Sequence, residues 1–389
     1  MDVLQQGVLA LIHAAITAEP AALPEGFSLA SALDPIRRHQ IAGLAYEGAV
    51  VCGIDPKEEA MQKLRRAYYA NMLRSEKQLQ ALSKIFDAFQ SNSIDYLPLK
   101  GCVLKSLYPQ PGMRPMGDAD ILIRMEQYDR IKPVMQSMGY TEKISNDYEL
   151  VWISPELYLE LHKTLMPSKS PDFFRYFENA WQRAKPENGC RYSLSPEDTF
   201  VFLFVHYAKH YRGGGIGLRQ LTDLWVYKRA NPTLDMDYVR KEMAALKLEK
   251  FFDNTEDMLK NWFENGLETD VTAFMSSFIW NSGSWGSRET HAIWAGIKST
   301  HKAGSRLFGK IRDVIKVLFP PAKILRIRYP IVGKAPWLTP VFWPVRWVTA
   351  LLFRRKNVRN FHKDMQAQTD ENMDAYQQAL AYVGLDCDF

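Results

Sequence analysis

The sequence predicts an α/β (α+β) fold in which a small mixed sheet is flanked by N-terminal and C-terminal helical regions. Apolar residues recur every three or four positions up to residue 93 and again from residue 195, which is the helical period. Between these regions, over residues 94–165, the pattern changes to the alternation of β-strands. A chain of 389 residues is also longer than one hydrophobic core usually supports. We therefore expect four parts, and their boundaries are 1–93, 94–190, 191–300 and 301–389.

The N-terminal part is expected to be helical throughout. Residues 1–20 are read as an amphipathic first helix and not as a secretion signal, because Asp2 stands where a signal carries Lys or Arg. Residues 33–50 have helical spacing. Residues 57–92 contain neither Pro nor Gly, so they predict one helix of about 50 Å at 1.5 Å per residue.

The central part is expected to contain the sheet. Its pattern favours strands and helices in the order β-α-β-α-β-β. The expected strands are residues 94–101, 118–125, 142–154 and 156–165, and the expected helices are 102–108 and 125–140. Residues 109–117 are expected to form a loop.

Helical spacing returns at residues 195–212. Ser195 is the expected N-cap and Pro196 the first helical residue. A second helix is expected over 218–230. The glycine-rich residues 212–217 between the two are read as a hinge and not as a phosphate loop, because no GK[ST] follows them.

Composition indicates a cytoplasmic globular protein with an anionic partner. Hydrophobic residues make up 47% and charged residues 24%, and the four cysteines form no CxxC pair, which argues against disulfides and structural zinc. Lys302–Lys363 holds fifteen Lys and Arg against one acid, Asp313, a net charge of +14. Since the whole chain carries +5, the rest carries −9. This asymmetry predicts a membrane surface, nucleic acid or a polyanionic substrate as partner, with a solvated basic face as the plain alternative.

Residues 337–353 are strongly apolar but do not predict a transmembrane helix. The stretch is seventeen residues long and contains Pro340, Pro344 and Arg346, whereas a spanning helix needs about 20 apolar residues. It is expected to lie at a membrane interface or to pack on the protein's own core. An enzyme held peripherally at the inner face of the membrane is therefore one hypothesis.

Asp118 and Asp120 form the central motif. Residues i and i+2 of a strand project from one face, so the two carboxylates are expected side by side. Two negative carboxylates side by side repel each other, and a divalent cation between them would neutralise their charge. Mg²⁺, or Mn²⁺ in its place, takes carboxylate oxygens together with substrate phosphates.

Neighbouring residues add phosphate-binding and catalytic candidates. Lys100 and Gly101 form a strand-to-helix turn where backbone N–H groups could approach an anion. Arg114 is expected to contact phosphate oxygens. Glu160, which shares a strand face with His162, is expected to be a third carboxylate that ligates a metal or acts as base. An exposed structural acid is the alternative for Glu160.

A second polar group is expected on the helices after residue 195. His206 and His210 lie one turn apart and, with Arg219 and Asp223, are expected to line the cleft opposite the carboxylates. A zinc site made by the two histidines and Asp223, or a buried hydrogen-bond network, are the alternatives. Lys209 is expected at the surface.

The string LPLKGCVLKSLYPQPGMRPMGDADILI resembles the nucleotidyltransferase superfamily related to DNA polymerase β. It is especially similar to the bacterial uncharacterised nucleotidyltransferase family, and the similarity extends to the helical lead-in, to HYAKH…LRQLTDLW and more loosely to the basic tail. The resemblance implies that Asp118 and Asp120 ligate the metal and that Glu160 is the third carboxylate. It also implies that Lys100 and Gly101 replace the superfamily's Gly-Ser phosphate turn.

One departure from that pattern is Cys102, where the superfamily has Ser or Thr. The hydroxyl contact to phosphate is then missing, and Lys100 or Arg114 would have to replace it. The expected function is magnesium-dependent transfer of a nucleoside monophosphate from a nucleoside triphosphate (NTP) such as ATP to an unidentified hydroxyl or phosphate acceptor. That acceptor could be a small molecule, a glycan, a lipid-linked or surface-polysaccharide substrate, or a protein. A catalytically lapsed scaffold that binds nucleotide or polyanion is the alternative, and nucleic acid ranks below membrane as partner.

Overall fold

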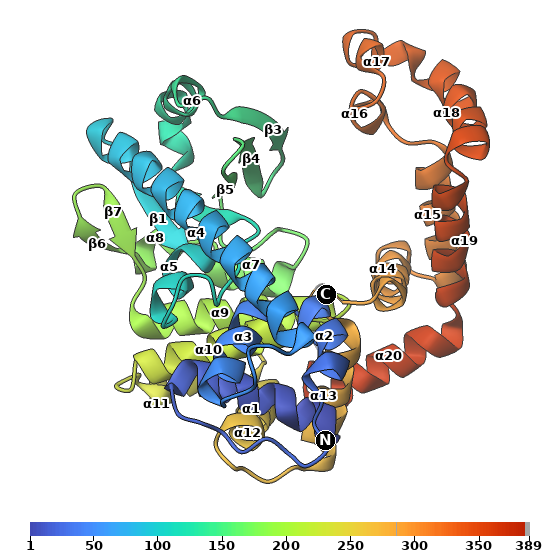
Figure 1. Ribbon diagram of the computed structural model, residues 1–389. Helices are drawn as coiled ribbons and strands as arrows, with labels where there is room; N and C mark the ends of the chain where they lie inside the picture. Colours follow the sequence, from blue (N-terminus) through green and yellow to red (C-terminus); the bar gives the residue numbers. More distant parts are fainter. Residues whose placement is uncertain (285, 386–389) are drawn as a thin grey trace. The chain divides into compact units, whose positions relative to one another are not determined.

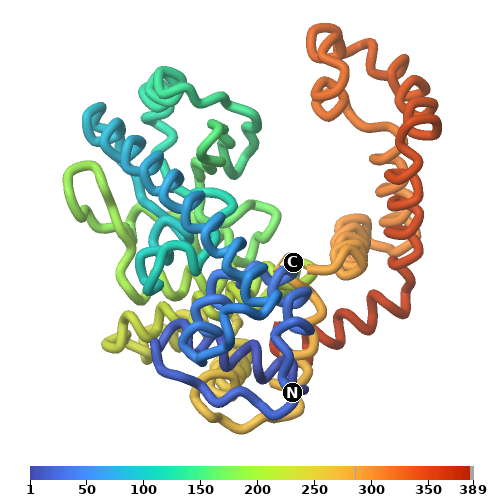
Figure 2. Tube along the Cα trace, in the orientation of Figure 1, coloured from blue at the N-terminus to red at the C-terminus, as the bar shows by residue number. Residues whose placement is uncertain are grey.

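The computed structural model describes residues 1–284 and 286–385 and has the mixed α/β architecture that the sequence predicts (Figures 1 and 2). In the described chain, seven strands form one sheet in the order β3-β4-β5-β2-β1-β7-β6, with helical regions before and after it. The chain divides into two compact units. The first comprises residues 1–210, 216–284 and 383–385, and the second comprises 211–215 and 286–382. The predicted fold class is confirmed.

Four helices precede the sheet: α1 (Val3–Thr17), α2 (Leu29–Arg38), α3 (Ala42–Val51) and α4 (Glu59–Ser91). The side chain of Asp2 caps α1 by accepting from the backbone N–H of Gln5. Helix α4 is the single long helix expected over residues 57–92. The expected helix 33–50 is two helices instead, because the positive φ of Gln40, +56°, interrupts the helix between α2 and α3.

The strands are β1 (Tyr96–Leu99), β2 (Ala119–Ile123), β3 (Thr141–Ser145), β4 (Glu149–Ile153), β5 (Tyr158–His162), β6 (Lys185–Asn188) and β7 (Arg191–Ser193). β2 runs antiparallel to β1 and parallel to β5. The helical segments among them are α5 (Gly101–Leu104), η1 (Lys105–Leu107), η2 (Met125–Gln127), α6 (Tyr128–Ser137), α7 (Pro171–Phe177) and α8 (Ala180–Arg183).

The expectation of one strand over residues 142–154 is wrong. Those residues form the β3–β4 hairpin, which turns at Asn146. The Asn146 side-chain oxygen accepts from the backbone N–H groups of Tyr148, at 2.7 Å, and Glu149, at 2.8 Å. This is the local bonding by which Asn reverses a chain.

The sheet has a hydrophobic face and a polar face. The C-terminal half of α4 and helix α6 supply side chains to a core that also takes Ile121, Leu159 and Leu161 from the sheet. Because successive strand residues point to opposite faces, Asp120, Glu160 and His162 are left on the other face. The alternation of β2 and β5 thus gathers three polar side chains on one surface of the sheet.

The remaining helices follow the sheet. Those of the first unit are α9 (Pro196–Arg212, whose last two residues belong to the second unit), α10 (Leu218–Ala230), α11 (Met236–Ala245), α12 (Glu249–Phe263) and α13 (Asp270–Ser282). Those of the second unit are α14 (Arg288–Ala303), α15 (Arg306–Leu318), α16 (Ala322–Leu325), α17 (Pro330–Lys334), η3 (Pro336–Leu338), α18 (Thr339–Phe353), α19 (Arg355–Ala367) and α20 (Asp370–Val383, whose last residue belongs to the first unit). Ser195 caps α9 as expected, because its hydroxyl accepts from the N–H of Asp198 at 3.0 Å. None of the helices in the described ranges is long and apolar enough to cross a bilayer.

The cysteines carry no cross-link in the described residues. Cys52, Cys102 and Cys190 are free thiols. Cys387, the fourth cysteine, lies outside the described part of the chain.

Candidate functional site

The site begins at the turn between β1 and α5. All of β1 is buried, and Lys100, the next residue, has φ of +42°, a conformation that residues other than glycine rarely adopt. The Lys100 ammonium donates to Asp120 Oδ1 at 2.7 Å. At Gly101 a Cβ would lie 3.0 Å from the Met116 side chain and 3.1 Å from Arg114 Nη1, so the close packing here suits glycine.

Asp120 lies at the centre of the site. It is only 3% exposed and accepts a second hydrogen bond on Oδ1 from His162 Nε2 at 2.7 Å. Burial alone would raise the pKa of this carboxyl, but the charge of Lys100 and the His162 bond hold its pKa well below the ordinary value. Asp120 is therefore a permanent anion inside the protein. The sequence predicted that a cation neutralises the carboxylates, and in the structure Lys100 neutralises part of this charge.

Glu160 is the cross-strand neighbour of Asp120 in the parallel β2–β5 pair. Its Oε2 lies 3.6 Å from His162 Nε2, which agrees with the expected shared face. Burial, followed by the negative charges of Asp120 and Asp118, raises the pKa of Glu160 from 4.5 to about 8. The carboxyl is therefore protonated at neutral pH, and a nearby cation would make it release that proton.

Within the described residues, one group has ligand atoms close enough to hold a metal ion. Its members are Asp120, Glu160 and His162, whose ligand atoms all lie within 4.8 Å of one another. Carboxylate oxygens suit Mg²⁺ and Mn²⁺, and the imidazole nitrogen suits Mn²⁺ better than Mg²⁺. The donor set therefore fits a divalent cation.

Asp118 lies beside this group but is not a member of it. Burial, then the charge of Asp120, raises the pKa of Asp118, whereas Lys100 and Arg219 act to lower it. Its predicted role as a metal ligand stays a prediction. Three carboxylates thus lie near one another, of which Asp120 is buried and Asp118 and Glu160 are half-buried.

Arg114 and Asp223 form a separate buried ion pair. The guanidinium donates through Nε to Asp223 Oδ1 at 2.7 Å and through Nη2 to Oδ2 at 2.9 Å. Tyr108 also donates to Asp223 Oδ1, at 2.7 Å. Arg219 Nη1 donates to the carbonyl of Pro115 at 3.0 Å. This cluster fixes the loop that leads into Asp118. The expected grouping of Asp223 and Arg219 with the two histidines along a cleft stays a prediction.

Helix α9 brings His206, Lys209 and His210 toward the carboxylates. The Nε2 atoms of the two histidines lie 3.1 Å apart. Burial, then the charge of Lys100, holds the pKa of His206 well below 6.5, so this ring is neutral beside the site. The two histidines and Asp223 do not form a metal-binding group in the described residues.

Sequence reasoning missed two residues, Lys209 and Tyr148. Lys209 was expected at the surface but is half-buried, and its ammonium lies 6.0 Å from the centre of the Tyr148 ring. Burial, then Lys100, lowers the pKa of Lys209 to about 8, while Asp120, Glu149 and Glu160 act against this. The Tyr148 ring in turn meets His162 edge-on at 4.8 Å. Lys209 follows three positions after His206, so its helical spacing was a usable signal, whereas Tyr148 depends on the hairpin.

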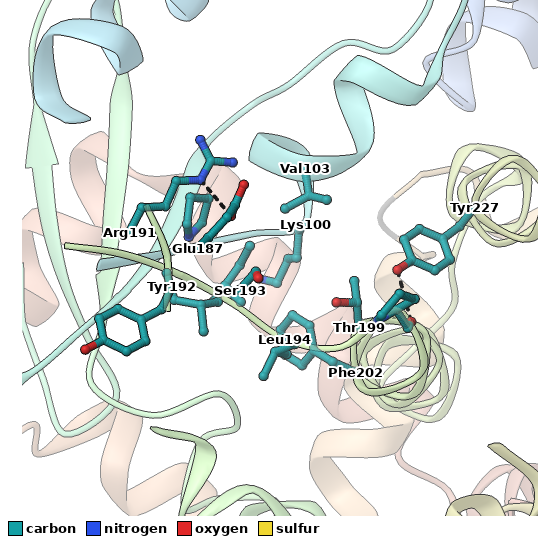
Figure 3. A pocket seen from close by; sticks show the side chains of 14 residues that line it. Lys100, Val103, Glu187, Arg191, Tyr192, Ser193, Leu194, Thr199, Phe202 and Tyr227 are labelled. Atoms are coloured by element: carbon teal, nitrogen blue, oxygen red, sulfur yellow. Dashed lines mark hydrogen bonds and ion pairs between the residues drawn. The ribbon is translucent and has the colours of Figure 1, made fainter. Parts of the chain in front are cut away.

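A pocket of about 250 Å³ adjoins the site. Figure 3 shows Lys100 and Val103 on one side of it and Thr199, Phe202 and Tyr227 on another, with the Arg191–Glu187 ion pair at a third. Because Lys100 lines this pocket and also binds Asp120, the pocket lies next to the carboxylates. Its walls combine apolar side chains with a few polar groups, as ligand pockets do.

Comparison with known proteins gives one match. A family model described as uncharacterised nucleotidyltransferase matches residues 27–264. No curated protein and no solved structure matches the chain. The matched residues include all seven strands and every candidate site residue, and they end before the basic segment Lys302–Lys363.

Proposed function

Because the chain belongs to the uncharacterised nucleotidyltransferase family, we propose that it transfers a nucleoside monophosphate from an NTP to a hydroxyl or phosphate acceptor. The observation that carries this proposal is the group Asp120, Glu160 and His162 beside Lys100 on one face of the sheet. In the reaction, the acceptor oxygen bonds to the α-phosphorus, the bond to the bridging oxygen breaks, and pyrophosphate leaves.

Asp120 and Glu160 would hold a divalent cation, Mg²⁺ or Mn²⁺, with Asp118 as a further ligand, and His162 would join them through a ring nitrogen that carries no proton. The Lys100 and His162 bonds both end on Asp120 Oδ1, so Oδ2 is the oxygen that a cation would take. When bound, the ion neutralises charge on the phosphates and on the leaving group.

The chain's own residues bind the phosphates and move a proton. Lys100 and Lys209 are ammonium groups near the carboxylates, and they would bind phosphate oxygens. The Arg114–Asp223 pair would hold the loop before Asp118 in position. Arg114 would then support phosphate binding by fixing this loop, instead of by the direct contact that the sequence predicted. Glu160, once it has lost its proton, would accept the proton of the acceptor hydroxyl.

The pocket beside Lys100 (Figure 3) is the proposed seat of the nucleoside or of the acceptor. Leu99, Val103 and Phe202 supply apolar surface for a flat ring. Thr199 and Ser193 supply hydroxyls for its polar edge.

A catalytically lapsed scaffold is the second candidate. Two observations favour it: Cys102 replaces the hydroxyl residue of the superfamily, and Lys100 already neutralises Asp120. Such a protein would bind nucleotide without turning it over.

Pyrophosphate release, measured with each of the four common NTPs and Mg²⁺, separates the two candidates. Turnover with one NTP that is lost in Asp120→Asn supports the transferase. Asp129→Asn, an exposed aspartate on α6, is the matched control and should keep wild-type turnover. Binding in a thermal-shift assay without pyrophosphate release, even with a broad acceptor panel, would instead establish the scaffold.

A further inference from the structure

Helix α15 is amphipathic, but it presents its apolar side to solvent. Leu307, Phe308, Ile311, Ile315 and Leu318 form one stripe at helical spacing, and all five are exposed, Leu307 by 67%. Surface helices of globular proteins bury such a stripe against the core.

The polar side of α15 is the side that packs inward, against α14. Gly309 is buried there, and a Cβ on it would lie 2.9 Å from the backbone nitrogen of Thr300. Ser299 of α14 donates to Asp313 at 2.6 Å and accepts from Arg312 at 3.0 Å. These contacts hold the polar side of α15 against α14, so the apolar stripe on the opposite side of the helix faces solvent.

Helix α18 repeats this arrangement. Val341, Val345, Val348 and Leu352 form an exposed stripe at helical spacing, and Phe353 at the end of the helix is 81% exposed. The other side of α18 is attached to the end of α15, because Trp343 donates to the carbonyl of Pro320 at 3.0 Å and Trp347 to that of Leu318 at 2.8 Å.

Basic side chains surround these two stripes. No Asp or Glu occurs between Val314 and Lys363, whereas eleven Lys and Arg do. Among them Lys323, Arg326 and Arg328 are exposed near α16, and Arg354, Arg355 and Lys356 are exposed at the end of α18. Ile327, in the middle of the first cluster, is 83% exposed.

We propose that this segment, residues 305–359, docks on an anionic phospholipid surface. Its exposed Leu, Ile, Val and Phe side chains enter the boundary between headgroups and acyl chains, while the Lys and Arg side chains bind the headgroup phosphates. Neither feature alone indicates a membrane. Together they match a surface that is apolar inside and negatively charged outside, and this docking is independent of the proposed nucleotidyl transfer.

Other partners fit the same residues less well. Nucleic acid would be met by basic groups together with polar and aromatic side chains, and it offers little to a stripe of Leu, Ile and Val. A second copy of the chain would place this strongly basic segment against another of the same charge.

Co-sedimentation of the full chain with vesicles tests the proposal. Vesicles of phosphatidylglycerol and phosphatidylcholine in equal parts should bind the protein, those of phosphatidylcholine alone should bind it far less, and high salt should weaken the binding. Charge reversal in Arg354→Glu, Arg355→Glu and Lys356→Glu should weaken binding to the anionic vesicles about tenfold or more. The combination Leu307→Gln, Ile311→Gln and Ile315→Gln should do the same without loss of helix in circular dichroism, because these side chains are exposed.

Matched variants in the first unit serve as controls. Arg66→Glu, Arg74→Glu and Lys77→Glu change the same charge on exposed residues of α4. Val50→Gln, Leu73→Gln and Leu267→Gln change as many exposed apolar residues. Controls that lose binding equally, or a wild type that does not bind anionic vesicles, would overturn the proposal. So would binding to duplex nucleic acid but not to vesicles, or concentration-dependent dimers that the Gln substitutions in α15 abolish.

Discussion

The sheet site and the α15–α18 segment use the same kinds of residues in opposite ways. In β2 and β5, Ile121 and Leu161 are fully buried and the charge of Asp120 is met inside the protein by Lys100. In α15 and α18 the apolar stripes are exposed, and the stretch from Val314 to Lys363 contains eleven Lys and Arg but no Asp or Glu. Because its apolar side chains are buried and the charge of Asp120 is paired, the sheet site needs no outside partner to be stable. The second segment leaves its apolar stripes and most of its basic side chains exposed, which is the surface that the proposed membrane docking would use.

Removing the charge at the centre of the sheet site should have the largest effect. Asp120→Asn should lower the rate of pyrophosphate release by about 10³-fold or more, because an electrostatic group at the reacting phosphates is lost. It should also destabilise the fold, since Lys100 and His162 lose a buried partner. Urea unfolding beside the rate assay separates the two effects. Wild-type turnover in Asp120→Asn would show that the site is not catalytic.

Breaking the buried Arg114–Asp223 ion pair should have the next largest effect, and the effect is on stability. Arg114→Met leaves the Asp223 carboxylate buried without its bidentate partner, so the free energy of unfolding should fall by about 3–5 kcal/mol. Arg240→Met breaks the exposed pair with Asp253 and should cost no more than about 1 kcal/mol. Urea denaturation measures both. Equal losses would mean that burial does not distinguish the two pairs.

Apolar truncation sharpens the contrast between the two regions. Ile121→Ala in β2 should lower the free energy of unfolding by about 2–5 kcal/mol, because it leaves a cavity in the core. Ile311→Ala in α15 should change it by about 0.5 kcal/mol or less, because that side chain is exposed. A large loss for Ile311→Ala would mean that the α15 stripe is packed against the chain itself.

The last prediction concerns the pH dependence of stability that Glu160 contributes. Its pKa in the folded chain is about 8, against 4.5 as the ordinary value, so the folded state binds a proton that the unfolded state has lost. Stability should therefore decrease as pH rises from 4.5 to about 8. Glu160→Gln should show a smaller decrease over this range in chelator-treated buffer. If the two pH profiles coincide, the carboxyl is already ionised in the folded state.

The sequence predicted those parts of the structure that depend on local patterns. The long helix α4, the Ser195 cap and the strand that carries Asp120 all follow from spacing or from single capping residues. The strands β6 and β7 were missed, because β6 is exposed throughout and lacks an apolar alternation.

The contacts within the site were harder to foresee, because they join distant residues. Arg114 and Asp223 are separated by 109 positions, and Asp120 meets Glu160 only through the parallel register of β2 and β5. Residue types and strand alternation indicated Asp120, Glu160 and His162 as candidates. Lys209 was placed wrongly, because a Lys in a helix is ordinarily exposed and only the packing of α9 shows otherwise.

The most direct test is Mn²⁺ binding followed by electron paramagnetic resonance, with and without an NTP. The wild type and the control Asp129→Asn should remove free Mn²⁺ signal, more strongly with the NTP present. Asp120→Asn, shown to be folded by circular dichroism, should leave that signal free. If Asp120→Asn binds Mn²⁺ as the wild type does, the carboxylates of the sheet site do not hold the metal, and the proposed reaction is contradicted.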